Sequence, residues 1–211
     1  LQHLPLSDKE LVRTHTGDLK ATDADDLVPQ RTTGSTGEPL TFYVGRERIS
    51  HDVAARWRAI RWWGLDIGDP EFVVWGSSIE LGVQNRLRTL RDRLLRSYLF
   101  PVADFYTARL DRYIHEMRRI RPAMMFGYPS ALAQLALRAR ARQLDMGHLG
   151  IRVAFVTSEV LQPQWRDLIS QVFNCSVANE YGAREAGLLG RECPNGGIHL
   201  SAEFIILETL D

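Results

Sequence analysis

A run of hydroxyl and glycine residues at positions 32–39 has the chemistry of an anion-binding loop. Glycine lets the backbone approach an anion closely, hydroxyls donate hydrogen bonds, and successive backbone N–H groups form a concave anion site. The residues with these properties are Thr33, Gly34, Ser35, Thr36 and Gly37. A polyphosphate fits this set, but no Gly-Lys-Ser/Thr follows, so the loop is not a Walker A motif. A plain surface turn has a similar composition, and composition alone leaves both interpretations open.

A second group of polar residues lies at positions 179–187, directly after a predicted strand. Loops at the carboxyl ends of strands are where open α/β sheets bind ligands. Tyr181 could stack on a nucleobase, Gly182 permits close approach of the backbone, and Glu185 could hold a magnesium ion that bridges phosphates. The simpler alternatives are a core position for Tyr181 and a solvated carboxylate for Glu185.

The chain has two cysteines, too few for a disulfide scaffold at 211 residues. Cys193 and His199 form a C-x5-H pair in a segment rich in proline and glycine, and both side chains are suited to zinc. Two ligands do not make a structural zinc site. The alternative is a buried thiol and an exposed histidine.

These motifs lie in an alternating pattern of strands and helices. Runs of apolar, β-branched and aromatic residues predict strands at positions 40–44, 71–75, 95–100, 124–126, 151–156, 175–179 and 204–207. Periodic apolar residues predict helices at positions 49–60, 110–120, 130–144 and 163–173. Ser130 is a candidate cap, and Pro163 suits a first turn. Because the strands are apolar throughout, the pattern favours an α/β sheet covered by helices on both faces, in one main domain.

The charge balance excludes global attraction to nucleic acid. Lys and Arg together number 26, as do Asp and Glu, so the formal net charge is zero. A basic segment contains Arg86, Arg88, Arg91, Arg93 and Arg96, which we interpret as a solvated face rather than a nucleic-acid or coenzyme A site. No run of 18 apolar residues occurs, so we expect no membrane association and a cytoplasmic location.

Five segments in order resemble a known family. They are positions 32–39, 127–132, 157–159, 179–187 and 192–199. Together they look like the phosphate-binding loop, the Tyr-Gly-x-x-Glu motif and the neighbouring segments of the adenylate-forming superfamily. The resemblance is to the branch of phenylacetate-CoA ligase and its coenzyme F-adenylylating and capsule-biosynthesis relatives, and it runs over nearly the whole chain. It implies part of the large amino-terminal α/β domain of an adenylate-forming enzyme.

The resemblance implies a reaction in two halves. A carboxylic acid, favoured to be aromatic, attacks the α-phosphorus of ATP to give an acyl-adenylate, and coenzyme A then takes the acyl group. Thr36 and Glu185 would be the catalytic residues, with Glu185 serving magnesium. The other roles carried over by position are phosphate binding by Thr33, Gly34, Ser35, Thr36 and Gly37, adenine binding by Ser158, Glu159, Tyr181 and Gly182, and acyl binding by Trp75, Gly76, Tyr128 and Pro129.

The sequence departs from the family's pattern at two positions. Arg184 stands where the family has a Thr or Ser that hydrogen-bonds the α-phosphate, although an arginine could pair with phosphate. Leu40 stands where many members have lysine. The family's ribose-binding aspartate and lysine-bearing carboxyl-terminal domain would lie beyond Asp211. We therefore expect a lead-in segment with the phosphate loop at 1–38 and a nucleotide- and acyl-binding core at 39–211.

These departures leave two functional hypotheses. The chain could be a truncated ligase core that binds nucleotide with little turnover, or a catalytically silent relative that acts as a binding module. An exposed sheet edge could also pair with a second copy, so a homodimer is a possible assembly.

Overall fold

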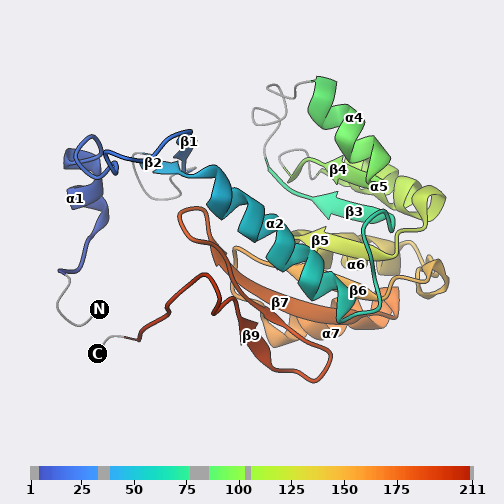
Figure 1. Cartoon of the computed structure of the whole chain (residues 1–211). Coiled ribbons are helices and arrows are strands. Elements are labelled where there is room, and N and C mark those ends of the chain that lie inside the picture. Colours follow the sequence, from blue (N-terminus) through green and yellow to red (C-terminus); the bar gives the residue numbers. More distant parts are fainter. Residues whose placement is uncertain (1–4, 33–38, 77–85, 103–105, 210–211) are drawn as a thin grey trace.

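Short apolar runs form the strands of a seven-stranded sheet in a computed structural model that describes residues 5–32, 39–76, 86–102 and 106–209. The sheet order is β4-β3-β5-β6-β7-β8-β9, with parallel pairing from β4 to β7 and antiparallel pairing from β7 to β9 (Figure 1). The strands are β3 (Glu71–Val74), β4 (Ser97–Phe100), β5 (Met124–Gly127), β6 (Val153–Val156), β7 (Ser176–Ala183), β8 (Gly187–Glu192) and β9 (Ile198–Leu200).

Helices cover both faces of this sheet, which confirms the predicted α/β class. α2 (Arg46–Arg61) crosses one face, while α6 (Pro129–Ala141) and α7 (Pro163–Phe173) lie behind the other (Figure 1). α5 (Thr107–Ile120) joins α6 and α7 in one apolar core, and α4 (Arg86–Leu94) contacts β4 at the sheet edge. None of the described helices is long and apolar enough to cross a membrane.

The alternation of side chains along the strands separates two apolar cores. Phe72, Val74 and Met125 face the larger core with α5, α6 and α7. Met124 and Phe155 face the opposite side, where they pack near the carboxyl-terminal half of α2. Successive residues of a strand point to opposite faces, so a strand that is apolar throughout supplies both cores at once.

The register sets one edge at which the parallel strands end. Val74, Gly127, Val156 and Asn179 are paired in line across β3, β5, β6 and β7. Gly127 belongs there because a Cβ would lie 2.6 Å from the carbonyl oxygen of Val74. The residues that follow these four positions therefore come together at the carboxyl edge of the sheet.

A separate two-stranded hairpin precedes α2. β1 (Val28–Arg31) pairs antiparallel with β2 (Thr41–Val44), and α2 begins two residues after β2 ends. The Thr32 hydroxyl accepts a hydrogen bond from the Leu40 N–H at 2.9 Å, and the Thr32 N–H donates to the Leu40 carbonyl at 2.9 Å. The hairpin thus holds both ends of the hydroxyl- and glycine-rich segment, whose residues 33–38 lie outside the described part of the chain.

Several local predictions were incomplete or wrong. The strand expected at positions 204–207 does not form, because Phe204 and Ile205 donate to the Ser201 carbonyl and the segment turns toward α2. The motif at 179–187 was expected after a strand, yet β7 continues through Ala183 because β8 pairs with it. The elements that the sequence patterns did not predict are β1, β8, β9, α4 and a short helix α1 (Lys9–Thr14).

Candidate functional site

The strand order reverses direction between β3 and β5, and this places a ligand crevice at their carboxyl ends. The chain leaves β3 for β4 on one side and then returns to add β5 on the other. Such a reversal point is where open α/β sheets bind ligands. Trp75 follows β3 and Tyr128 follows β5, and their rings stack with centroids 4.5 Å apart at an interplanar angle of 3°. Two of the residues predicted for acyl binding are therefore brought together.

A cavity of about 550 Å³ lies between α2 and this edge. We call it the carboxyl-edge cavity. Its lining comprises Gln30, Arg48, Ile49, Asp52, Arg56, Trp75, Phe126, Thr157, Ser158, Glu180, Gly182, Ala183, Arg184, Gly187, Leu188 and Arg191. It contains Trp75, Ser158, Gly182 and Arg184 from the sequence predictions, and its volume suits a small-molecule ligand.

Charged residues spaced four apart on α2 form one wall of this cavity. Arg48, Asp52 and Arg56 lie on the same helical face, and the Asp52 Oδ1 accepts a hydrogen bond from the Leu188 N–H at 2.6 Å. Gly187 makes this approach possible, since its φ is +82° and a Cβ would lie 2.8 Å from the Asp52 Oδ1. The sequence did not indicate these residues, because charged side chains four apart on a helix are equally typical of a solvated face.

Two guanidinium groups of the cavity lining lie against aromatic rings of the parallel sheet. The Arg56 guanidinium lies 4.7 Å from the Phe126 ring centroid, and the Arg191 guanidinium lies 4.3 Å from the Phe155 ring centroid. Phe126 and Phe155 are register partners in β5 and β6, so the two cations lie side by side.

Each of these two arginines, Arg56 and Arg191, has an acidic partner. Arg56 pairs with Glu71, and Arg191 pairs with Glu180 across β7 and β8. Arg191 is only 1% exposed, and this burial, together with the neighbouring Arg56, lowers its pKa to about 9. Arg191 therefore remains a cation at neutral pH.

The hairpin and the 179–187 motif meet at the mouth of the cavity. The Arg184 Nη1 donates to the Arg31 carbonyl at 2.7 Å, and the Arg184 carbonyl accepts from the Arg48 Nη2 at 2.7 Å. Arg31 is two residues from the start of the segment 33–38. A hydrogen bond thus joins the 179–187 motif to the hairpin that carries the hydroxyl- and glycine-rich segment.

Comparison with known proteins assigns a fold to this arrangement. No protein-family model matches the chain. Protein CapK of Staphylococcus aureus is 22% identical over 209 residues, which cover 99% of this chain and 46% of CapK. The chain therefore spans about half the length of this curated relative.

Solved structures give the same result. A 2-hydroxyisobutyryl-CoA ligase in complex with 2-HIB-AMP and CoA superimposes with a TM-score of 0.66 at 19% identity, covering 92% of this chain and 44% of the ligase. A malonyl-CoA ligase with methylmalonyl-CoA and AMP bound gives a TM-score of 0.52 at 20% identity, covering 86% of this chain and 38% of that one. The chain has the fold of the adenylate-forming ligases.

Of the residues predicted for adenine binding, Ser158 and Gly182 line the cavity, whereas Glu159 and Tyr181 do not. Ser158 is exposed and has a φ of +69°. The Glu159 carboxylate accepts a hydrogen bond from the Ser130 N–H at 3.2 Å, at the first turn of α6. The Ser130 side chain was expected to cap this helix, but Tyr128 is the N-cap residue and Glu159 contacts the helix instead. Tyr181 is 53% exposed and lies outside the cavity lining.

The other acyl candidates and the magnesium candidate lie near the cavity without lining it. Gly76 has a φ of +70°, and its carbonyl accepts from the Val102 N–H at 3.1 Å. Pro129 is buried at the start of α6. Glu185 is exposed in the tight turn between β7 and β8. A single carboxylate suits magnesium only when substrate phosphates supply further oxygen ligands, so the magnesium role of Glu185 stays a prediction.

The proposed zinc pair does not fit a metal. Cys193 is buried at 8% exposure, whereas His199 is exposed and its ring lies 5.0 Å from the Trp62 ring. Across the described residues, no group of three His, Cys, Asp or Glu side chains could hold a metal ion. A structural zinc site needs four ligands, and within the described ranges Cys193 and His199 have no third partner of these types.

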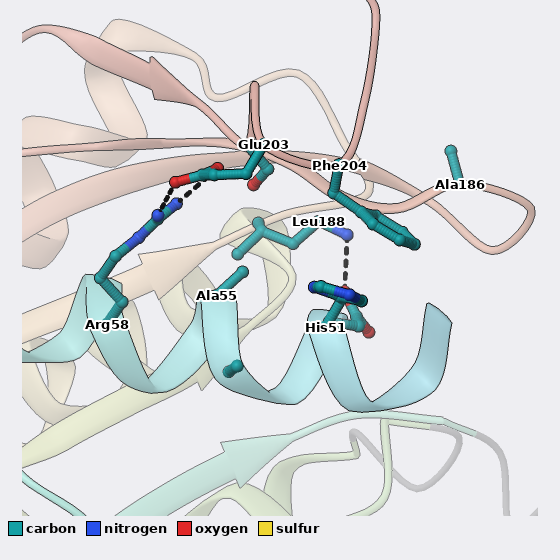
Figure 2. A pocket seen from close by; sticks show the side chains of 10 residues that line it. His51, Ala55, Arg58, Ala186, Leu188, Glu203 and Phe204 are labelled. Carbon is teal, nitrogen blue, oxygen red and sulfur yellow. Dashed lines mark hydrogen bonds and ion pairs between the residues drawn. The ribbon is translucent and has the colours of Figure 1, made fainter. Parts of the chain in front are cut away.

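A smaller cavity of about 240 Å³ lies between α2 and the segment after β9, and it shares Asp52 and Leu188 with the carboxyl-edge cavity (Figure 2). The His51 ring stacks on Phe204 with centroids 4.4 Å apart, and Arg58 pairs with Glu203. These contacts hold the segment after β9 against α2. They connect that segment to the helix that also forms the carboxyl-edge cavity.

Proposed function

We propose that this chain forms the nucleotide- and acid-binding part of an AMP-forming carboxylate-CoA ligase. One observation carries the proposal: the hydrogen bond from Arg184 to Arg31 links the loop-bearing hairpin to the 179–187 motif at the mouth of the carboxyl-edge cavity. The adenylate-forming fold supports it. The chain spans less than half of CapK, so the complete reaction is proposed for a protein of CapK's length that includes this part.

The proposed reaction begins with attack of an acid carboxylate on the α-phosphorus of ATP. Pyrophosphate leaves and an acyl-adenylate forms, and the thiol of coenzyme A then takes the acyl group and releases AMP. The protein's part is positioning and stabilisation of negative charge. Thr33, Gly34, Ser35, Thr36 and Gly37 would hold the β- and γ-phosphates.

Further residues would complete the phosphate and adenine sites. Arg184 lies in the mouth of the cavity, where its cation would meet the α-phosphate. Glu185 would serve magnesium, which neutralises phosphate charge when bound. Adenine would lie against Ser158, Glu159, Tyr181 and Gly182.

The acyl group would lie on the aromatic side of the cavity. Trp75 stacks on Tyr128, and its ring centroid is 5.3 Å from that of Phe126. Gly76 and Pro129 flank these rings in the sequence. A wall of aromatic rings favours an aromatic acid through ring stacking.

Calorimetric titration with ATP and magnesium tests the nucleotide site. We expect Thr36→Ala and Glu185→Ala each to weaken binding by about ten-fold, because each removes a group that contacts charged phosphates or their metal. The matched controls are Thr22→Ala and Glu208→Ala, which change exposed residues remote from both motifs in the sequence and should leave affinity unchanged. Equal loss in all four variants, or binding that ignores Thr36 and Glu185, would contradict the proposal.

A second candidate is a catalytically silent binding module. It is favoured by the position of Arg184, whose side chain donates to a backbone carbonyl where the family has a hydroxyl. Acid-dependent exchange of pyrophosphate into ATP, measured on a protein of CapK's length that includes this part, distinguishes the two. Exchange supports the ligase, whereas nucleotide binding without exchange supports the silent module.

A further inference from the structure

The lining of the carboxyl-edge cavity contains more cationic than anionic side chains. Four arginines line it, Arg48, Arg56, Arg184 and Arg191, against two carboxylates, Asp52 and Glu180. An excess of cationic side chains at a cavity favours a ligand that carries acceptor oxygens.

A second cavity, with a mixed lining, lies under the same helix at the opposite edge of the sheet. It has a volume of about 570 Å³, and we call it the amino-edge cavity. Its apolar lining residues are Val53, Trp57, Ile60, Ile67, Leu95 and Met124, and Asp66, Asp69, Glu71, Arg91 and Asp92 lie at its charged part. Met124 is the first residue of β5, whereas Phe126, near the end of the same strand, lines the carboxyl-edge cavity. If the two cavities were continuous, they would together hold an acid with an extended acyl chain.

The pair formed by Arg56 and Glu71 lies between the two cavities. Among the described lining residues, Arg56 alone contributes to both. The Glu71 side chain is 8% exposed and also accepts a hydrogen bond from the Ser97 hydroxyl at 2.9 Å. Moving Arg56 aside would leave a buried carboxylate without its cation, which is strongly unfavourable. An apolar acyl chain therefore cannot displace the Arg56 side chain without a large cost in free energy.

We propose, on the basis of the proposed function, that the acid bound here carries a second hydrogen-bond-accepting group, a hydroxyl or another carboxylate, remote from its reacting carboxylate. Arg56, held by Glu71, positions that group and closes the route to the amino-edge cavity. The substrate class is therefore polar acids of limited length. Long apolar acids are excluded by the same ion pair.

Binding of matched acids to the chain tests this inference. We expect para-hydroxybenzoate to bind about ten-fold more tightly than para-methylbenzoate, because the two have nearly the same shape and only one gains a hydrogen bond to a cation. Octanoate should bind weakly. The double variant Arg56→Met/Glu71→Leu replaces the pair with apolar groups, and it should lose the preference for the hydroxyl and gain affinity for octanoate.

The chain offers a matched control on the same helix. Arg58 pairs with Glu203 at the smaller cavity, and neither residue lines the carboxyl-edge or the amino-edge cavity (Figure 2). Arg58→Met/Glu203→Leu should keep the preference of the unmodified chain. Thermal unfolding checks that both double variants fold. If the first does not, Arg56→Lys keeps the charge beside Glu71 but loses the planar guanidinium, and it should still reduce the preference.

A parallel titration with ATP and magnesium separates this inference from the proposed function. If the chain binds nucleotide but binds both acids equally or neither of them, the inference is overturned and the proposed function stands. If it distinguishes the acids but does not bind nucleotide, the proposed function fails instead. A preference that survives Arg56→Met/Glu71→Leu would overturn the role of Arg56.

Discussion

The thiol of Cys175 shows how one buried position sets the chemistry of a side chain. Cys175 lies between α7 and β7 at 7% exposure, and its carbonyl accepts a hydrogen bond from the Ser170 hydroxyl at 2.7 Å. Burial raises the pKa of its thiol from an ordinary 9.0 to about 12. Because the thiolate is the reactive form, this residue is chemically inert in the folded chain.

Alkylation therefore reports unfolding at this residue. At roughly pH 8 we expect iodoacetamide to modify Cys175 slowly in the native chain and readily in denaturant, as measured by peptide mass spectrometry. The folded pKa is raised, so the stabilising contribution of the neutral thiol is complete below pH 9.0 and is lost as the pH rises toward about 12. A Cys175→Ala variant should show a smaller loss of stability in that window. Rapid modification of the native chain would contradict this account.

At the scale of elements, α6 depends on a residue from a different loop. Its N-cap residue Tyr128 makes no side-chain capping hydrogen bond, and the Glu159 carboxylate, after β6, accepts from the Ser130 N–H. A carboxylate at a helix amino terminus satisfies a free donor and opposes the positive end of the helix dipole. The helix and the loop that contains Ser158 are thereby held together.

Removing that carboxylate should loosen the start of α6. We expect Glu159→Ala to lower the free energy of unfolding by about 1 kcal/mol, which is typical of a lost helix cap. Glu159→Gln, which keeps an acceptor oxygen, should lose less. Urea denaturation measures both, with exposed Glu208→Ala as the control. Identical unfolding midpoints for Glu159→Ala and the unmodified chain would show that the contact is not stabilising.

For the whole molecule, the buried pair of Arg191 and Glu180 joins the two kinds of sheet. Glu180 is the first residue of β7 beyond the parallel register, and Arg191 pairs with it from β8. Arg191 also contacts Phe155 of the parallel sheet and the Arg56 carbonyl of α2 at 3.5 Å. One side chain thus links α2, the parallel strands and the antiparallel strands.

This pair should behave as a unit in mutagenesis. We expect Arg191→Met alone to lower the free energy of unfolding by about 3 kcal/mol, because it leaves the half-buried Glu180 carboxylate without its cation. Arg191→Met/Glu180→Leu should recover most of that loss. Chemical denaturation of both single variants and the double variant gives the coupling free energy. A double variant as unstable as Arg191→Met would show that the guanidinium acts through packing rather than charge.

The local sequence was sufficient to predict the strands of the parallel half of the sheet and the helices that cover it. Runs such as Val153–Val156 and the periodic face of Thr107–Ile120 have a strong apolar pattern because they are buried on both faces or along one stripe. The alternation of strands and helices also predicted that ligand-binding residues lie at the carboxyl ends of the strands. The sequence motifs also indicated Trp75, Ser158, Gly182 and Arg184, which the structure brings to one cavity.

Tertiary contacts determine the antiparallel strands and the burial of the charged residues near them. Gly187–Glu192 contains glycines and charges and has little intrinsic strand pattern, so it becomes a strand only by pairing with β7. The same pairing buries Arg191, because Glu180 lies opposite it. The charged face of α2 is likewise indistinguishable from a solvated face in the sequence, until the turn at Gly187 packs against it. Long-range pairing partners make charged residues buriable, and a linear sequence does not contain those partners locally.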